Sequence, residues 1–204
     1  MTPIVDPEMR AYYERRAAEY DDWWLGTGLF ANRDRPGWDA EVAALVGIIA
    51  ALPPGRVLDV ACGTGFLTRH LRGDVVALDQ SASMAAIAGT RVPQAEVVTA
   101  DAVPLPFPDG EFDRVFTSHF YGHLLPEERE SFLTEARRAS RELVVVDSAL
   151  RPDQPPEIWQ MRVLEDGSRH HVYKRYFSAS GLAAEVRASR TLHDGAWFVA
   201  VATP

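Results

Sequence analysis

Three aspartates stand where carboxylate chemistry is expected. Asp59, Asp79 and Asp101 each lie at or just after the end of a short apolar run, with Asp79 about 20 residues beyond Asp59. Burying a carboxylate at the end of a strand is costly unless the group has a task. A carboxylate can accept hydrogen bonds from both vicinal hydroxyls of a ribose, so Asp79 is placed to bind a nucleotide. The same position would serve the ribose of NAD, and Asp101 alone would also suit a helix cap or an Asx turn.

The residues around Asp59 predict how such a site is built. Residues 56–68 read RVLDVACGTGFLT, an apolar run followed by two glycines. The run is typical of a strand that is covered on both faces. Gly63 and Gly65 lack side chains where the backbone must turn tightly or let a ligand come close. A strand, a glycine turn and a following helix form the nucleotide-binding opening of a Rossmann-like sheet.

Helix and strand patterns alternate along the rest of the chain. Helices are predicted over residues 7–24, 38–51, 81–91, 126–140 and 178–184, with another between Gly65 and Gly73. Strands are predicted over residues 56–60, 74–78, 95–99, 113–118, 142–147, 185–192 and 197–202, the last two joined by a turn at Asp194-Gly195. We therefore expect an α/β fold, a Rossmann-like doubly wound sheet of about seven strands, mostly parallel with an antiparallel C-terminal hairpin.

The length of the chain predicts one domain. Its 204 residues can bury one α/β core and leave little for a second. We divide the expected domain into N-terminal helices that form a cap, the binding core, a loop, and the C-terminal helix with its hairpin, at residues 1–52, 53–150, 151–177 and 178–204. The third part is predicted as a loop because it begins rich in proline and then shows no clear period.

The composition excludes several classes of partner. A net charge of −8 argues against a protein that binds the backbone of nucleic acids. No apolar run approaches the ~20 residues of a membrane span, and the N-terminal sequence lacks the layout of a secretory signal. The single cysteine, Cys62, cannot form an internal disulfide. We expect a cytoplasmic monomer or homodimer with neither nucleic acid nor membrane as a partner.

A metal site is also not expected. The adjacent residues His170 and His171 would point to opposite faces of a strand and would diverge on a helix, so they do not form a ligand pair. A cysteine cluster is ruled out by the cysteine count.

Four segments occur in an order that is known from one protein family. They are VLDVACGTG at 57–65, the acidic residue of VVALDQS at 75–81, TADAVPLPFPDGEFDRVF at 99–116, and the terminal hairpin. Together they resemble the class I S-adenosylmethionine-dependent methyltransferases of the small-molecule, UbiE-like kind, and the resemblance extends from about residue 12 to 201. The family's acidic-x-Gly-x-Gly-x-Gly pattern has Ala61 in place of its first glycine, a small change that leaves the pocket open.

The resemblance implies a cofactor and a set of residues that bind it. S-adenosyl-L-methionine is the expected cofactor and S-adenosyl-L-homocysteine the product. Asp59 is expected to face the cofactor's ammonium group and Asp79 the ribose, while the Asp101 carboxylate accepts from the adenine amino group. The full expected set is Tyr12, Tyr20, Asp59, Ala61, Gly63, Gly65, Asp79, Gln80, Met84, Asp101, Ala102 and Ser118. Met84 and the tyrosines would equally suit a hydrophobic core.

Two histidines follow Ser118 on the same predicted loop. By resemblance a histidine here lies close to the transferred methyl group, and we favour His123 over His119 as the catalytic residue. A neutral imidazole could take a proton from a hydroxyl or amine while the methyl group arrives. A lone histidine is also common as a packing residue. The acceptor is expected to be a small molecule that is methylated on O, N or C and bound near residues 151–177.

Two alternatives remain open. An NAD-dependent oxidoreductase would share the strand, the turn and Asp79, but here Thr68 replaces the third glycine of the dinucleotide fingerprint. A protein that binds S-adenosylmethionine without transferring its methyl group is not excluded by any residue.

Overall fold

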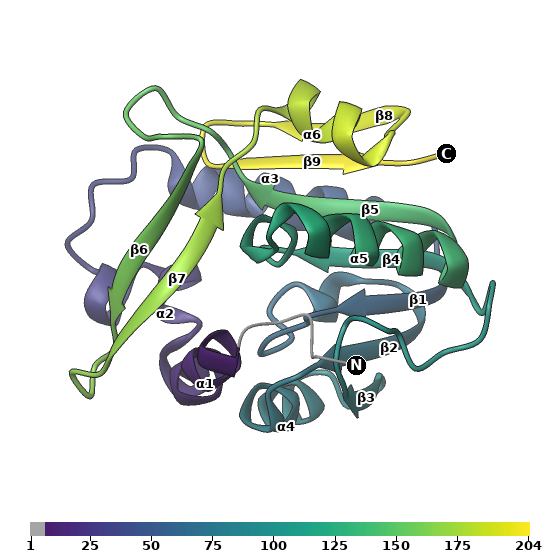
Figure 1. The fold of residues 1–204 in the computed structure, drawn as a ribbon, viewed down its shortest axis with the longest axis horizontal. Coiled ribbons are helices and arrows are strands. Elements are labelled where there is room, and N and C mark those ends of the chain that lie inside the picture. Colours follow the sequence, from purple (N-terminus) through teal and green to yellow (C-terminus); the bar gives the residue numbers. More distant parts are fainter. Residues whose placement is uncertain (1–6) are drawn as a thin grey trace.

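The centre of the computed structural model is a seven-stranded sheet with the strand order β3-β2-β1-β4-β5-β9-β8 (Figure 1). The structure describes residues 7–204. Residues 1–6 lie outside the described residues. They include the start of the expected N-terminal cap and of the segment that was compared with a secretory signal. The sheet strands are β1 Gly55–Val60, β2 Gly73–Asp79, β3 Glu96–Thr99, β4 Phe112–Ser118, β5 Ser140–Ser148, β8 Arg190–Asp194 and β9 Phe198–Ala202.

The pairing of these strands confirms the predicted sheet. Strands β1 to β5 pair in parallel, β9 runs antiparallel to β5, and β8 runs antiparallel to β9. The strand predicted at 185–192 begins later than expected, at Arg190, because Glu185 and Val186 still belong to helix α6, Ala179–Val186.

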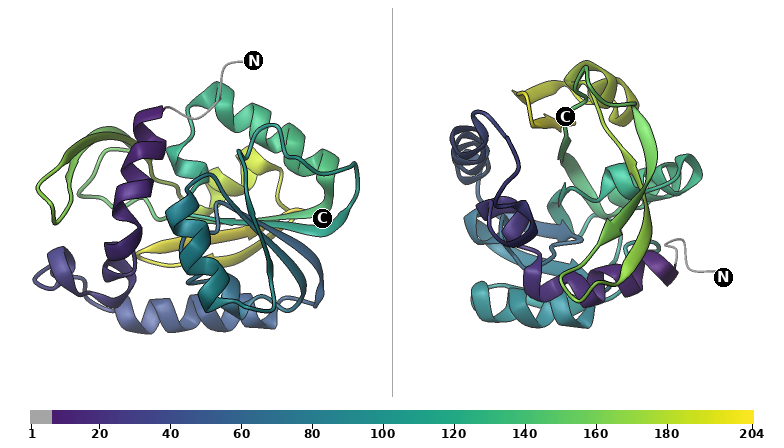
Figure 2. Two further views of the ribbon diagram at one scale, coloured as in Figure 1. Left: turned by 90° about the horizontal axis from the view of Figure 1, so that it is seen from below. Right: turned by 90° about the vertical axis from the view of Figure 1, so that its left-hand side faces the viewer.

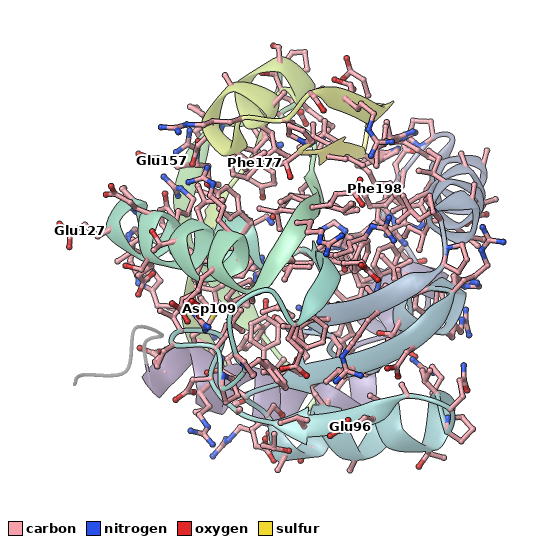
Figure 3. All side chains as sticks on the ribbon, turned by 90° about the vertical axis from the view of Figure 1, so that its right-hand side faces the viewer. Glu96, Asp109, Glu127, Glu157, Phe177 and Phe198 are labelled. Carbon is pink, nitrogen blue, oxygen red and sulfur yellow. The ribbon has the colours of Figure 1, made fainter. Side chains whose placement is uncertain are left out.

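Helices cover both faces of the sheet, as a doubly wound fold requires. On one face, α5 (Pro126–Ala139) and α6 enclose a core that includes Phe132 and Phe177. On the other face, α3 (Trp38–Ala51) packs its residues Leu45 and Ile49 into a second core with Phe198. Figure 3 shows Phe177 and Phe198 on opposite sides of the sheet. Helix α4 (Ala82–Arg91) packs on β2 and β3.

The α-helix predicted between Gly65 and Gly73 is wrong. This segment forms a single 3-10 turn, η3, at Thr68–His70. The reason is geometric, because Gly73 pairs beside Gly55 and the chain must return along the whole of β1. That strand is about 20 Å long, whereas eight residues of α-helix would cover only about 12 Å.

The N-terminal helix predicted at 7–24 is interrupted. It forms α1 (Pro7–Arg16), the 3-10 turn η1 (Ala17–Glu19) and α2 (Asp22–Leu25). On α1, Glu14 accepts hydrogen bonds from the hydroxyls of Ser81 and Ser83 at the start of α4. Asp21, just before α2, accepts one from the Thr64 hydroxyl at 2.6 Å. Both carboxylates thus fasten the N-terminal segment to the sheet.

The loop predicted at 151–177 contains a second sheet. Residues Glu157–Val163 (β6) and Arg169–Arg175 (β7) form an antiparallel hairpin. It lies beyond the carboxyl ends of the parallel strands (Figure 1). Figure 2 shows α1 running between this hairpin and α4, in agreement with the contacts that α1 makes with β7 and α4. Tyr12 packs there with Leu164 and Val172. The strand pattern was missed because β7 buries polar His170 and Lys174 beside apolar residues.

Over residues 7–204, no helix is both long enough and apolar enough to cross a membrane.

We predict that Gly73→Ala destabilises the protein strongly. Gly73 has a φ of +109°, and an added Cβ would lie 2.1 Å from the carbonyl oxygen of Gly55. The free energy of unfolding, measured by urea denaturation, is expected to fall by more than about 2 kcal/mol. Gly47→Ala, at an exposed position of α3 with no atom within 4 Å of the new Cβ, is the matched control. The control should be neutral or gain roughly 0.5–1 kcal/mol. Equal unfolding midpoints for the two variants would contradict this account.

Candidate functional site

Two cavities meet at the carboxyl ends of β1, β2 and β4. The smaller one has a volume of about 50 Å³ and lies under α1. The larger one, of about 750 Å³, lies between the N-terminal segment and the β6–β7 hairpin. Four residues line both cavities, namely Tyr13, Tyr20, His119 and His123. In parallel sheets this edge is where ligands bind.

Asp79 ends β2 and lines the smaller cavity. Its Oδ2 accepts the backbone N–H of Gly63 at 2.8 Å, and its Oδ1 accepts that of Ser81 at 2.9 Å. Each oxygen keeps a second lone pair for a ligand. Burial raises the pKa of the Asp79 carboxyl to about 6, while backbone hydrogen bonds from Ser81, Gly63 and Gln80 lower it in part.

The turn after β1 presents its backbone to the smaller cavity. Ala61 and Gly63 both line it and both have positive φ angles, +58° and +56°. An L-residue pays about 1–2 kcal/mol for this conformation, which accounts for the glycine that the family's pattern has at Ala61. Gly65 has another role, because an added Cβ would lie 3.0 Å from Val92 of the segment that ends α4. It lets the turn pack on α4 and does not line either cavity.

Asp59 is buried in β1 and does not line either cavity. The Thr68 hydroxyl donates to its Oδ2 at 2.6 Å. Burial raises the pKa of the Asp59 carboxyl to about 7, partly offset by this hydrogen bond. Thr68 stands where the dinucleotide fingerprint has its third glycine. In this chain its side chain therefore serves as a hydrogen-bond donor to Asp59.

The predicted adenine-side residues divide into two groups. Gln80, Met84 and Ala102 line the smaller cavity, as does Ser118 at the end of β4. Asp101 is exposed and lines neither cavity. Its carboxylate therefore lies outside the enclosed part of the site.

His123 has a defined tautomer. Its Nδ1 lies 2.7 Å from the carbonyl oxygen of Tyr173, which can only accept, so Nδ1 carries the proton and Nε2 keeps a free lone pair. Burial and the positive charges of Lys174 and Arg162 hold the pKa of His123 well below its usual value. The ring is neutral at physiological pH.

His119 is held in a more enclosed place. Its Nδ1 lies 3.3 Å from the Ser148 hydroxyl, and its buried Nε2 has no hydrogen-bond partner among the described residues. Rings of Trp23, Trp24 and Phe198 lie within 6 Å of the imidazole. Burial lowers the pKa of His119 to about 3.

A buried ion pair supports this loop from behind. Lys174 Nζ lies 2.5 Å from Oδ1 of Asp147, and the same carboxylate accepts the N–H of Gly122 at 2.7 Å. Gly122 belongs to the 3-10 turn η4 (Tyr121–His123), so the ion pair links β5 and β7 to the turn that carries His123. Sequence patterns gave no signal for it, since its residues lie far apart in the chain.

The N-terminal tyrosines take different places. Tyr20 lines both cavities and its ring lies 3.4 Å from the position of a Cβ on Gly63. Tyr12 lines only the larger cavity, where its hydroxyl accepts from Arg16 at 2.7 Å. Tyr13, outside the predicted cofactor set, lines both cavities, and burial raises the pKa of its hydroxyl to about 12. Glu14, which fastens α1 to the start of α4, was not predicted as a functional residue. Its pKa is lowered by the hydrogen bonds from Ser81 and Ser83.

No group of three potential metal ligands occurs among residues 7–204.

Comparison with known proteins gives consistent matches. Residues 58–143 match the family model of a methyltransferase domain. A demethylmenaquinone methyltransferase of Renibacterium salmoninarum is 37% identical over 137 residues, which are 66% of this chain and 54% of that protein. One of Beutenbergia cavernae is 37% identical over 120 residues, 56% of this chain and 49% of that protein. The chain spans about half the length of these curated relatives.

Two solved structures match over nearly their full length. The DhpI–SAM–HEP complex has a TM-score of 0.78 and 26% identity, covering 100% of this chain and 99% of that one. The DhpI–SAH complex has a TM-score of 0.71 and 29% identity, covering 96% and 94%. These matches agree with the resemblance, and the fold that the sequence predicted is confirmed.

We predict that Asp59→Asn stabilises the ligand-free protein, and more so at high pH. A carboxyl whose pKa rises from 3.8 to about 7 on folding favours the folded state below pH 4 and loses that contribution as the pH rises through 7. At pH 8 the variant should gain roughly 1–3 kcal/mol in unfolding free energy over the wild type, and little at pH 4. Urea denaturation at both pH values measures this. An equal effect of the substitution at pH 4 and pH 8 would contradict the raised pKa.

Proposed function

We propose that this chain, a class I S-adenosylmethionine-dependent methyltransferase of the UbiE-like kind by sequence and fold, transfers a methyl group to O, N or C of a small-molecule acceptor. When bound, S-adenosylmethionine supplies a methyl group on a positively charged sulfur, which leaves as a neutral thioether when a nucleophile attacks in line. The observation that carries the proposal is that Asp79 lines the smaller cavity, while His123 lines both this cavity and the larger one.

The residues of the smaller cavity fit this cofactor. Asp79 has a free lone pair on each oxygen for the two ribose hydroxyls, and Gly63 offers backbone without a Cβ beside it. Met84 and Ala102 provide an apolar surface against which the adenine can pack, and Gln80 lines the same cavity. Asp59 and Gly65 were predicted to bind the cofactor, but they line neither cavity, so we propose that they shape the turn from behind. Asp101 stays a predicted adenine contact, at the exposed edge of the site.

The N-terminal segment covers the cofactor in this proposal. The rings of Tyr13 and Tyr20 line the wall over the smaller cavity, where an aromatic face favours a sulfonium. That cavity is narrower than the cofactor, so these two rings shift outward when the cofactor enters. Tyr12, which faces the larger cavity, contributes to the acceptor side.

The larger cavity receives the acceptor. Its walls include Trp23, Phe30 and residues of β6 and β7, where the acceptor was expected. The chain's work is mainly to align the acceptor and exclude water, since the leaving group is already activated.

Where the acceptor carries a proton on its nucleophile, Nε2 of His123 takes that proton as the methyl–sulfur bond breaks. His119 is the second candidate for this role. The small-molecule acceptor agrees with the quinone substrates that the names of the relatives state. A cytoplasmic place of action stays a prediction.

The alternatives make different demands on the site. An NAD-dependent oxidoreductase would need its third turn glycine, where the chain has Thr68 bonded to Asp59. A protein that only binds the cofactor would not need the larger cavity or a histidine with a free lone pair between the two cavities.

We predict that Asp79→Ala weakens the binding of S-adenosylmethionine at least about tenfold, because the ribose loses charge-assisted hydrogen bonds. Isothermal titration calorimetry at pH 7.5 measures the dissociation constant. Asp166→Ala, at the exposed tip of the β6–β7 hairpin, serves as the control and should bind as the wild type does. Because Asp79 also holds Gly63, thermal unfolding must show that the variant is folded, and Asp79→Asn provides a milder test. Unchanged affinity in a folded Asp79→Ala variant would remove the cofactor assignment.

We predict that His123→Ala lowers methyl transfer roughly 100-fold while the affinity for S-adenosylmethionine is kept. The measurement is the release of S-adenosylhomocysteine with a panel of small hydroxyl, amine and activated-carbon acceptors, beside a calorimetric titration of the cofactor. His171→Ala, an exposed histidine on β7, is the control. Full turnover of His123→Ala would transfer the role to His119. Cofactor binding by the wild type without product from any acceptor would favour the binding-only protein.

A further inference from the structure

The larger cavity is cationic although the chain carries a net charge of −8. Six arginine or lysine residues line it, against two carboxylates, Glu19 and Asp34. Glu19 is engaged elsewhere, since its Oε2 accepts the backbone N–H of Glu165 at 2.9 Å. The excess of positive charge is therefore a property of this cavity and not of the surface at large.

Three of these cations have local partners. Lys174 is paired with Asp147 at 2.5 Å, and Arg151 with Asp153 at 3.2 Å. Arg35 donates to the carbonyl of Trp23 at 2.7 Å and lies over the ring of Trp38.

The other three arginines, Arg16, Arg33 and Arg162, lie over the rings of Tyr12 or Phe30 and have no carboxylate within 4 Å among the described residues. They come from α1, the loop before α3, and β6, so three separate segments bring them together. Arg16 and Arg162 both direct Nη1 at the hydroxyl of Tyr12, at 2.7 and 3.4 Å. Partial burial together with the positive charges of Arg162 and Arg16 lowers the pKa of Arg33, whereas for Arg162 the effect of burial is outweighed by the neighbouring hydroxyls of Tyr12 and Tyr13, which raise its pKa.

Such a cluster is costly without an anion. Like charges repel, and the repulsion is stronger at the buried residue Arg16 than at Arg33, which is more exposed to solvent. A guanidinium presents its N–H donors in a planar fork that matches carboxylate, phosphate and phosphonate oxygens, and it stays charged at any physiological pH. The aromatic side chains of Trp23, Trp38 and Phe30 line the same cavity and suit an apolar body.

We propose that the methyl acceptor carries an oxyanion, a carboxylate or a phosphoryl or phosphonyl group, which Arg16, Arg33 and Arg162 bind at the end of the larger cavity. The inference rests on the proposed function, since it names the chemical class of that acceptor. The anion fixes one end of the acceptor among the arginines. The remainder lies along the aromatic wall towards His123, which lines both cavities.

The test uses four aromatic probes of similar size that differ in the charged group, namely phenylphosphonate, benzoate, benzyl alcohol and benzylamine. Each is titrated by calorimetry into the full chain saturated with S-adenosylhomocysteine at low ionic strength. We expect at least one anionic probe to bind tenfold or more tightly than the neutral and cationic probes. The comparison of phenylphosphonate with benzoate shows which oxyanion the arginines prefer.

Variants assign the binding to the cluster. Arg33→Gln and Arg162→Gln should each weaken the preferred anionic probe at least tenfold and leave the affinity for S-adenosylhomocysteine unchanged. Arg169→Gln, an exposed arginine on β7 outside the cavity, is the matched control and should bind the probe as the wild type does. Arg16→Lys keeps the positive charge but removes the planar pair of N–H donors. Its effect on the affinity for the anionic probe therefore measures how much the guanidinium geometry contributes, while an ammonium group can still contact the Tyr12 hydroxyl.

The outcomes separate this inference from the proposed function. If S-adenosylhomocysteine binds but the anionic probes bind no better than benzyl alcohol, or bind the glutamine variants unchanged, the oxyanion inference is overturned and the methyltransferase proposal stands. If S-adenosylhomocysteine itself does not bind the wild type, the proposed function fails and the inference fails with it.

Discussion

The hydrogen bonds that Asp79 accepts from Gly63 and Ser81 tie together the ends of two neighbouring strands. They join the turn after β1 to the start of α4. A carboxylate buried at this place would be unfavourable without such donors. Gly63, whose N–H donates to this carboxylate, has a positive φ, a conformation that glycine adopts without steric cost. The pocket and the fold at this edge therefore depend on the same group.

A second layer of polar contacts holds the N-terminal segment over that edge. Glu14 accepts from the hydroxyls of Ser81 and Ser83, and the side chain of Asp21 binds Thr64 and Arg91. These contacts reach the residues next to Asp79 and Gly63. The segment that covers the site is thus fastened to the same turn that forms its floor, and small movements of one must be followed by the other.

The sequence predicted the sheet well because most of its strands contain a short apolar run and alternate with helical patterns at the spacing of a doubly wound fold. Of the residues predicted at the strand ends, Asp79, Gly63 and Ala102 line the smaller cavity, and their binding of the cofactor stays a prediction. The prediction from sequence failed where tertiary geometry overrides local propensity. The segment after Gly65 has to span the length of β1, so a helix cannot form there. The hairpin β6–β7 buries charged and polar residues against α1, which hides its alternation.

The arginines of the larger cavity could not be found from the sequence at all. Arg16 lies in a run of charged residues that reads as the solvated face of a helix, and Arg162 lies in a segment without period. Only the folding of α1 against the hairpin places them around Tyr12. Their meeting depends on contacts between residues that are about 150 positions apart in the chain, which no local pattern encodes.

Helix α1 forms a wall of both cavities, whereas β6 borders only the larger one. The two walls are therefore unequal in how freely they can change over evolution. A substitution on α1 that adapts the site to a new acceptor also alters the cover of the cofactor, so most such changes carry a penalty. Substitutions on β6 escape this coupling. Divergence of acceptor choice among proteins of this architecture should accumulate in the hairpin and leave the tyrosine-bearing helix comparatively constant.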